Sequence, residues 1–299
     1  MNLFPDIHEA LALLKAGEVV AIPTETVYGL AGDARNPLAI RRIYATKGRP
    51  AGHPVIVHLA MESNWEEWGV FSDKAHALAK AFWPGPLTLI LPRQAGVLDE
   101  ITGGRESVGL RVPDHPLTQT LLRDLGSGLA APSANRFGRI SPTTAEHIQQ
   151  EFEGLVPILD GGPALVGIES TIVDLTHEQP ALLRPGFIDK ESIESIVGPL
   201  GHSSTPAPGT LKSHYAPMTS LLLSHTPEED RLRLEKEGRS VAILKAKKTD
   251  QYARDLYAEL RRMDALGVDI LIAEPAPNIG LGHAINDRLS RAASKFSID

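Results

Sequence analysis

The chain has 299 residues, no cysteine and a formal net charge of −7 at pH 7. This length allows a substantial core and predicts two domains. The absence of cysteine excludes disulfides, a thiolate nucleophile and a cysteine–zinc site, and the acidic balance argues against a broad nucleic-acid surface, which would need a basic stripe.

Helix and strand patterns alternate irregularly over the first two thirds of the chain. Asp6 caps a predicted helix over 6–16, and Asn36 followed by Pro37 begins another that ends at Lys47. Further helices are predicted over 73–82, 116–125 and 143–150, and a short one after residue 189. Apolar runs predict strands over 19–22, 55–59, 87–91, 108–112, 128–132, 156–159, 171–175 and 181–184. Because no helix separates 87–91 from 108–112, we expect a mixed twisted α/β sheet with helices, not a doubly wound one.

A stretch rich in proline and small residues follows, over 201–217, and its composition is that of a linker. Beyond it, predicted strands over 220–223, 241–244 and 268–272 alternate with helices near 227–237, 250–265 and 281–294. The predicted organisation is a first domain over 1–200, a linker over 201–218, and a small three-layer α/β C-terminal domain over 219–299.

Two cations stand close together where the helix over 37–47 ends, in the run Lys47-Gly-Arg49-Pro50. Proline restricts the conformation of Arg49, so the two side chains can be aimed at one anion, with Arg as a planar fork and Lys as a point charge. Residues 1–195 carry 16 Lys and Arg against 24 Asp and Glu, which favours a local anion pocket over a long basic track. The alternative is a solvated basic helix end.

Other polar residues stand at the ends of apolar strands, where pockets form in α/β sheets. Arg111 interrupts a strand pattern, and it would either face an anionic ligand, pair with a carboxylate or lie in solvent. His58 is either a site residue or a satisfied core histidine, and Ser133 and Asn135 either contact a ligand or form an ordinary strand exit. The standard phosphate-loop, dinucleotide, HExxH and serine-elbow motifs are absent, and the histidines show no metal-ligand spacing.

Taken in order, these motifs resemble the YrdC/Sua5 family over about residues 7–196. The segments that carry the resemblance are Pro23–Leu30, Lys47-x-Arg49-Pro50, Pro54–His58, Trp83–Thr88, Arg111-x-Pro113, Ala131–Asn135, Ser141–Thr143, Glu169–Val173 and Leu183–Gly186. His214–Pro217, after the linker-like stretch, resembles the two-domain Sua5 branch. The resemblance implies a YrdC-like fold for the first domain and a threonylcarbamoyl-AMP synthase activity. Such an enzyme joins L-threonine, bicarbonate and ATP into L-threonylcarbamoyladenylate and releases pyrophosphate.

The resemblance also implies roles for individual residues. Lys47 and Arg49 would act in catalysis. The threonine site would contain Thr26, His58, Arg111, Ala131 and Thr171. ATP would meet Lys47, Arg49, His53, Ser107, Ser133, Asn135, Ser141, Arg184, His214 and Tyr215. His53 stands where the family pattern usually has asparagine, and no protein metal ligand is expected because Mg²⁺ would be carried by ATP.

The expected partners are L-threonine, bicarbonate, ATP, a downstream complex that transfers the threonylcarbamoyl group to tRNA, and tRNA itself through a weak contact. The first residues lack a charged and then apolar leader, and no run of about 18 apolar residues occurs, so we expect a cytoplasmic protein without membrane contact. Two alternatives stand beside this interpretation. One is a carbamoyl-adenylate enzyme of the hydrogenase-maturation type, and the other is an RNA-binding module.

Overall fold

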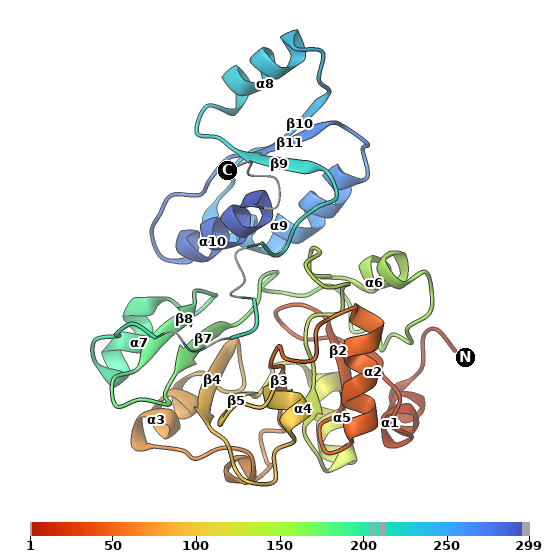
Figure 1. Cartoon of the computed structure of the whole chain (residues 1–299), viewed down its shortest axis with the longest axis vertical. Helices are drawn as coiled ribbons and strands as arrows, with labels where there is room; N and C mark the ends of the chain where they lie inside the picture. The colour runs from red at the N-terminus through yellow and green to blue at the C-terminus, as the bar shows by residue number, and fades with distance from the viewer. Residues whose placement is uncertain (1, 204, 206, 210–212, 295–299) are drawn as a thin grey trace.

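The computed structural model describes residues 2–203, 205, 207–209 and 213–294. Within these residues the chain forms an eight-stranded sheet, which ends at Arg184, and a three-stranded sheet, which begins at Ser220. Figure 1 shows the two sheets in separate bodies stacked along the long axis of the molecule. Of the predicted linker, residues 204, 206 and 210–212 lie outside the described residues, as do 295–299 of the predicted C-terminal domain.

The larger sheet is mixed, as the sequence predicts. Its strands are β1 (Val20–Ile22), β2 (Gly29–Asp33), β3 (Ile56–His58), β4 (Leu87–Pro92), β5 (Ser107–Arg111), β6 (Leu129–Ala130), β7 (Thr171–Asp174) and β8 (Ala181–Arg184). They lie in the order β1-β2-β6-β3-β5-β4-β7-β8, and the pairs β3–β5 and β4–β7 are parallel while the others are antiparallel. In the β3–β5 pair His58 stands beside Arg111, so the register alone brings these two residues together.

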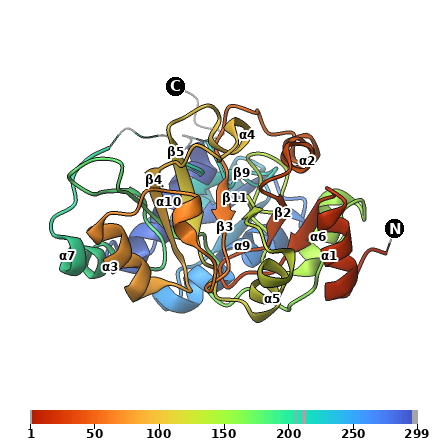
Figure 2. The same ribbon diagram turned by 90° about the horizontal axis from the view of Figure 1, so that it is seen from below.

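Helices cover this sheet. They are α1 (Ile7–Lys15), α2 (Pro37–Lys47), η1 (Trp65–Glu67), α3 (Asp73–Phe82), α4 (Asp99–Thr102), α5 (Pro116–Leu125), α6 (Ala145–Phe152) and α7 (Lys190–Val197). Seen from below in Figure 2, α3 and α7 lie together at one end, and α1 and α5 lie together towards the other. The main core between sheet and helices contains leucine, isoleucine and valine side chains with Tyr28 and Trp83.

The smaller sheet is parallel throughout. Its strands β9 (Ser220–Leu223), β10 (Val241–Leu244) and β11 (Ile270–Ala273) lie in the order β10-β11-β9. Helix α8 (Pro227–Lys236) lies on one side of the sheet, and α9 (Thr249–Asp264) and α10 (Leu281–Ala293) lie on the other (Figure 1). The predicted three-layer α/β arrangement is confirmed.

Two local differences from the sequence prediction stand out. The strand predicted over 156–159 is wrong, because this segment forms only an isolated bridge between Ile158 and Ala21. Pro157 has no N–H to donate, and the neighbouring N–H groups bond to Leu3 and Ala21, so no ladder extends. Conversely, β2 is a strand that the sequence does not predict, since its Gly-Leu-Ala-Gly-Asp sequence has low strand propensity.

Among the helices of the described ranges, none has the length and apolarity needed to cross a bilayer.

Candidate active site

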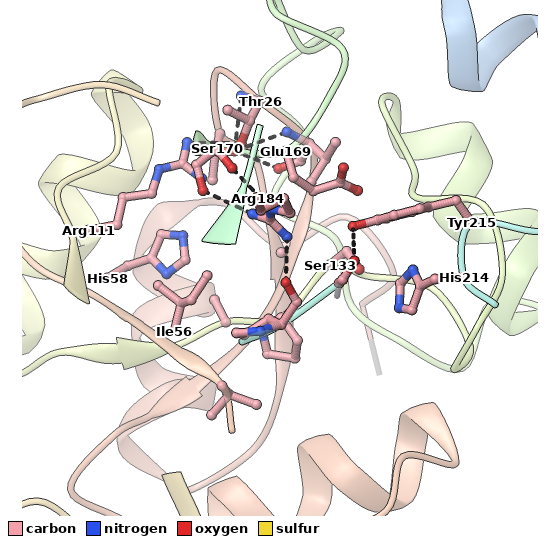
Figure 3. A pocket seen from close by; sticks show the side chains of 18 of the residues that line it. Thr26, Ile56, His58, Arg111, Ser133, Glu169, Ser170, Arg184, His214 and Tyr215 are labelled. Atoms are coloured by element: carbon pink, nitrogen blue, oxygen red, sulfur yellow. Dashed lines mark hydrogen bonds between the residues drawn. The ribbon is translucent and has the colours of Figure 1, made fainter. Parts of the chain in front are cut away.

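A pocket opens where β3, β5 and β6 meet the segments around Glu169 and Tyr215 (Figure 3). It encloses about 50 Å³. Its lining residues are Thr24, Thr26, Val27, Gly29, Arg49, Val55, Ile56, His58, Arg111, Ala131, Pro132, Ser133, Glu169, Ser170, Arg184, Pro208, Gly209, His214 and Tyr215. In Figure 3, Arg184 occupies the centre, with Arg111 and His58 on one side and His214 and Tyr215 on the other.

Nine residues predicted from the sequence line this pocket: Thr26, Arg49, His58, Arg111, Ala131, Ser133, Arg184, His214 and Tyr215. Six others do not line it: Lys47, His53, Ser107, Asn135, Ser141 and Thr171. Three of those six are one contact away, because Lys47 Nζ and the backbone N–H of Asn135 donate to the carbonyl oxygen of Ser133, and Ser141 bonds to Glu169. The structure therefore brings predicted residues that lie more than a hundred positions apart in the sequence, such as Thr26 and Tyr215, into one pocket.

Lys47, the last residue of α2, and Arg49, two residues further on, are the first two cations of the site. Asn36 caps its first turn, Pro37 stands at its start, and Gly48 ends it in the left-handed conformation at φ 62°. Lys47 is 3% exposed, and its Nζ donates to the carbonyl oxygens of Ser133 and Asn135. Burial, and next the charge of Arg49, lower the pKa of Lys47 well below its usual value. A solvated basic helix end is thus the wrong interpretation of Lys47.

Arg49 is also buried and has spare donor capacity. Its Nη2 donates to the carbonyl oxygen of Pro54 at 2.7 Å, while its Nε has no hydrogen-bond partner. The guanidinium lies 5.7 Å from the centre of the Phe137 ring. A buried N–H without a partner is costly unless a ligand accepts from it, so this donor favours an anion in the pocket.

Arg111 and His58 form one end of the pocket. Arg111 Nη2 donates to Thr26 Oγ1 at 2.9 Å and lies 2.8 Å from Glu25 Oε1, while its Nε donates to the carbonyl oxygen of Gly85 at 3.3 Å. The predicted alternatives of a carboxylate partner and a pocket position are therefore both realised. Burial, and then the charge of Arg111, lower the pKa of His58 to about 3, so this imidazole is neutral at physiological pH.

Arg184 is held in the middle by backbone and side-chain acceptors. Its Nε donates to the carbonyl oxygen of Ser170 at 3.0 Å, its Nη2 to Ser170 Oγ at 3.1 Å, and its Nη1 to the carbonyl oxygen of Pro208 at 3.0 Å. Pro208 belongs to the predicted linker, and both Pro208 and Gly209 line the pocket. Arg184 thereby connects the end of strand β8 to Pro208 in the lining of the pocket.

His214 and Tyr215 close the remaining side. Their rings lie 4.2 Å apart, and Tyr215 has a positive φ of 60°, which is uncommon for a bulky residue. Burial, helped by the charges of Lys47, Arg49 and Arg184 and opposed by that of Glu169, lowers the pKa of His214 to about 3. Tyr215 Oη donates weakly to the carbonyl oxygen of Gly209 at 3.5 Å.

The other predicted residues lie outside the lining. His53 is half-buried with its ring 5.4 Å from that of Phe137, and Ser107 is half-buried at the start of β5. The buried Asn135 donates to the carbonyl oxygens of Arg136 and Arg139, and its Oδ1 has no partner. Thr171 Oγ1 donates to the carbonyl oxygen of Ile188 at 2.7 Å. Their proposed ligand contacts stay predictions.

Sequence reasoning did not assign Glu169 and Ser170 to the site, although both line it. Glu169 is the pocket's carboxylate, and its neighbours are guanidinium and hydroxyl groups. Burial alone would raise the pKa of Glu169, but Arg288, Arg184, Ser141 and Tyr257 lower it to about 2. Two of these partners, Tyr257 and Arg288, come from the smaller body.

Chemically, the pocket suits a multiply charged anion. Three arginines, Arg49, Arg111 and Arg184, line it. The Nζ of Lys47 lies outside the lining and donates to the carbonyl oxygen of Ser133. Within the described ranges no group of three or more His, Asp or Glu side chains is placed to hold a metal ion. The arrangement therefore favours charge stabilisation and positioning over nucleophilic catalysis by the protein.

Two family models match the chain. The Sua5/YciO/YrdC model, described as telomere recombination, matches residues 12–186. The model described as threonylcarbamoyl-AMP synthase, C-terminal domain, matches residues 188–294.

Relatives match over nearly the whole length. The Bacillus subtilis threonylcarbamoyl-AMP synthase is 42% identical, covering 97% of this chain and 93% of the relative. The Pyrococcus abyssi threonylcarbamoyl-AMP synthase is 38% identical, covering 96% and 94%. The crystal structure of P. abyssi Sua5 complexed with L-threonine superposes with a TM-score of 0.92 at 37% identity, covering 96% of this chain and 94% of that one. The chain therefore belongs to the Sua5/YciO/YrdC family, in the two-domain branch that carries the threonylcarbamoyl-AMP synthase C-terminal domain.

Proposed function

We propose that this chain is a threonylcarbamoyl-AMP synthase, which forms L-threonylcarbamoyladenylate and pyrophosphate from L-threonine, bicarbonate and ATP. The observation that carries the proposal is the convergence of three buried guanidiniums on one pocket, in a chain similar over nearly its whole length to enzymes of that name. The substrates bring three sets of negative charge: a carboxylate, a carbamate and a triphosphate. The pocket offers Arg111 at one end for the carboxylate, and Arg49 and Arg184 at the other for the triphosphate.

Threonine occupies the end of the pocket formed by Arg111, His58, Thr26 and Ala131. Arg111 faces the amino-acid carboxylate, and the neutral imidazole of His58 lies beside it in the sheet. The P. abyssi relative has been solved with L-threonine, and its similarity supports an amino-acid site in this chain. Thr171 is assigned to this end only through the family pattern.

ATP occupies the opposite end, along Arg49, Ser133, Arg184, His214 and Tyr215. The unpartnered Nε of Arg49 supports a phosphate contact, and the open Oδ1 of Asn135 supports a further polar contact nearby. Lys47 contributes through its bonds to the carbonyl oxygens of Ser133 and Asn135. His53, Ser107 and Ser141 complete the proposed set. Mg²⁺ would arrive on the phosphate oxygens of ATP and would neutralise part of their charge.

The reaction needs no nucleophile from the protein. The threonine amine forms a carbamate, either from CO₂ with loss of a proton or from bicarbonate with loss of water. One carbamate oxygen then attacks the α-phosphorus, and the bond from the α-phosphorus to the oxygen that bridges it to the β-phosphorus breaks, so that pyrophosphate leaves. Arg49 stabilises the charge that develops on the α-phosphoryl oxygens and on the departing pyrophosphate, and Lys47 adds its charge while its Nζ bonds to the carbonyl oxygens of Ser133 and Asn135. Arg111 holds the reacting amino acid in place.

The segment over 201–218 acts as a lid between a first domain, 1–200, and a C-terminal domain, 219–299. Its Pro208 accepts a hydrogen bond from Arg184, and its Gly209 contacts Tyr215. The pocket encloses about 50 Å³, whereas pockets for drug-sized ligands hold roughly 300 Å³ or more. The lid must therefore move for substrates to enter, and once closed it protects the mixed anhydride from water.

The product serves tRNA modification in the cytoplasm: a separate complex transfers the threonylcarbamoyl group to tRNA, which this chain contacts only weakly. An acidic net charge of −7 supports a small-molecule role over extensive RNA binding.

The test is threonine-dependent release of pyrophosphate by the purified full chain with ATP and bicarbonate, with threonylcarbamoyladenylate detected by mass spectrometry. Release without threonine but with another carbamoyl donor would favour the carbamoyl-adenylate alternative. A salt-sensitive RNA affinity without ATP consumption would favour the RNA-binding alternative. Failure to release pyrophosphate in response to L-threonine would overturn the proposed function.

A further inference from the structure

A buried arginine from the smaller body reaches the wall of the pocket. Arg288 lies on α10 with no exposed side-chain area, and its Nε donates to Glu169 Oε2 at 2.9 Å. Its Nη1 donates to the carbonyl oxygen of Pro185 and to Asp287 Oδ2, at 2.9 and 2.8 Å. The guanidinium also lies 5.3 Å from the centre of the Tyr215 ring. A fully buried arginine needs such partners, because leaving it unpaired would be very costly.

A tyrosine on the neighbouring helix bonds to the same carboxylate. Tyr257 lies on α9, is fully buried, and its Oη donates to Glu169 Oε2 at 2.7 Å. Its ring stacks on that of Tyr215 with centroids 5.8 Å apart. One oxygen of Glu169 is thus occupied by two donors from α9 and α10.

The other oxygen of Glu169 faces the first body. Ser141 Oγ donates to Glu169 Oε1 at 2.5 Å, and Ser170, the next residue along the chain, accepts two hydrogen bonds from Arg184. Glu169 therefore stands between the smaller body and two residues assigned to the ATP end of the pocket. If Glu169 Oε2 lost the donor Tyr257 or Arg288, the carboxylate would shift or rotate. Ser141, which bonds to the other oxygen, and Ser170, the next residue along the chain, would then lose their fixed positions.

We propose that Arg288 and Tyr257 are positioning residues of the nucleotide site, which hold Glu169 so that Ser141, Ser170 and Arg184 are preorganised for ATP. The inference rests on the proposed function for the identity of the nucleotide. It gives α9 and α10 of the smaller body a part in the affinity for ATP, in addition to the part played by Pro208 and Gly209, which line the pocket. The ionised state of Glu169 at physiological pH agrees with this role.

The chain offers a matched pair of variants to test it. Tyr252 and Tyr257 both lie on α9, both are fully buried, and both donate one hydrogen bond of 2.7 Å, to the carbonyl oxygen of Glu274 and to Glu169 respectively. Tyr252→Phe and Tyr257→Phe thus remove the same group from the same helix. Only Tyr257→Phe removes a donor to the pocket wall.

The experiment measures KM for ATP, KM for threonine and the dissociation constant of a non-hydrolysable ATP analogue, in full-length wild type and both variants. We expect Tyr257→Phe to raise the KM for ATP and the analogue dissociation constant by about three- to tenfold, the range for the loss of an ordinary hydrogen bond, because Tyr257 acts on ATP only through Glu169. The KM for threonine should change by less than about twofold. Tyr252→Phe should leave all three constants unchanged, while thermal stability falls similarly in both variants.

A second comparison uses Arg288→Lys and Arg288→Met, each measured at a temperature where the same fraction of the protein is folded. Lysine keeps the charge and should retain more affinity for the ATP analogue than methionine. If Arg288→Met does not fold, the tyrosine pair decides. Equal ATP constants in Tyr257→Phe and Tyr252→Phe, with an active wild type, would overturn this inference alone. A wild type that releases no pyrophosphate in response to threonine would instead overturn the proposed function.

Discussion

The guanidinium of Arg111 lies 2.8 Å from the carboxylate of Glu25, and both side chains are almost wholly buried. The carboxylate oxygens of Glu25 have no hydrogen-bond donor in good geometry, so Arg111 is its electrostatic partner. Arg111 therefore has two roles that experiments must separate: it neutralises a buried acid, and it is the proposed fork for the threonine carboxylate.

Replacing Arg111 should affect threonine use and stability together. We expect Arg111→Ala to raise the KM for threonine about tenfold or more, because a charged hydrogen bond is lost. The same variant should lose about 3–5 kcal/mol of stability, because Glu25 is left buried and unpaired. Steady-state kinetics and urea unfolding measure the two effects.

The double variant Arg111→Met with Glu25→Gln separates these roles. It removes both charges, so stability should largely return while the threonine defect persists. A threonine KM equal to that of wild type in the double variant would contradict the assignment of Arg111 to the substrate.

Replacing Lys47 or Arg49 should mainly lower turnover. Lys47→Ala and Arg49→Ala should each reduce kcat on the order of a hundredfold, as when one group that stabilises developing charge is removed. Lys15→Ala is the control, because Lys15 also ends a helix as the basic residue of its last turn but is exposed. Similar kcat values in Lys15→Ala and Lys47→Ala would rule out a catalytic role for Lys47.

Two buried histidines should make stability fall in mild acid. The pKa of His58 and of His214 is about 3 in the folded chain, chiefly because of burial, against an ordinary value of 6.5. The unfolded chain therefore binds more protons between pH 6.5 and 3, so stability is complete above pH 6.5 and declines as the pH falls. At pH 5.5 we expect a loss of about 1 kcal/mol per histidine relative to pH 7.5.

Urea unfolding at the two pH values measures this loss. His58→Gln should reduce it by about 1 kcal/mol, whereas replacement of the exposed His8 should reduce it much less. An unchanged pH dependence in His58→Gln would show that His58 is not buried in its neutral form.

The proposed lid depends on a glycine. Gly209 has φ 78°, and a Cβ built there would lie 2.1 Å from Tyr215 Oη and 2.8 Å from Arg184 Nη1. We expect Gly209→Ala to displace this segment and to lower kcat/KM for ATP by about tenfold, equivalent to about 1.4 kcal/mol.

The control for Gly209→Ala is Gly238→Ala. Gly238 has φ 79° and nothing within 4 Å of its built Cβ. Alanine at Gly238 therefore has the same unfavourable positive φ as alanine at Gly209, but its Cβ clashes with no other side chain. Equal ATP kinetics in the two variants would mean that the contact of Gly209 with Tyr215 has no part in catalysis.

Local signals account for what the sequence predicts well. The Asn36-Pro37 start and glycine end of α2, and the Pro116 start and Gly126 end of α5, are strong helix boundaries, and both predicted ranges are confirmed. The segment over 156–159 has an apolar pattern too, but strand formation depends on a neighbour that can complete a ladder. That neighbour is set by tertiary structure, which pattern reasoning does not contain.

The candidate site divides in the same way. The ordered motifs indicate the family, and both family models confirm it. The partners of Glu169 were not predicted, because Tyr257 and Arg288 lie 88 and 119 positions away from it. One signal was available: Arg288 stands between Ile285, Leu289 and Ala292 on the apolar face of α10, where an arginine requires a buried partner.

The parallel register of β3 and β5 has a consequence for how this protein can change in length. His58 and Arg111 meet only because their strands are paired residue by residue, and successive residues of a strand point to opposite faces. One residue inserted before His58 within β3 would turn the imidazole to the other face of the sheet, while Arg111 stayed where it is. Connections that carry no site residue can therefore gain or lose residues over evolution, but β3 and β5 themselves cannot.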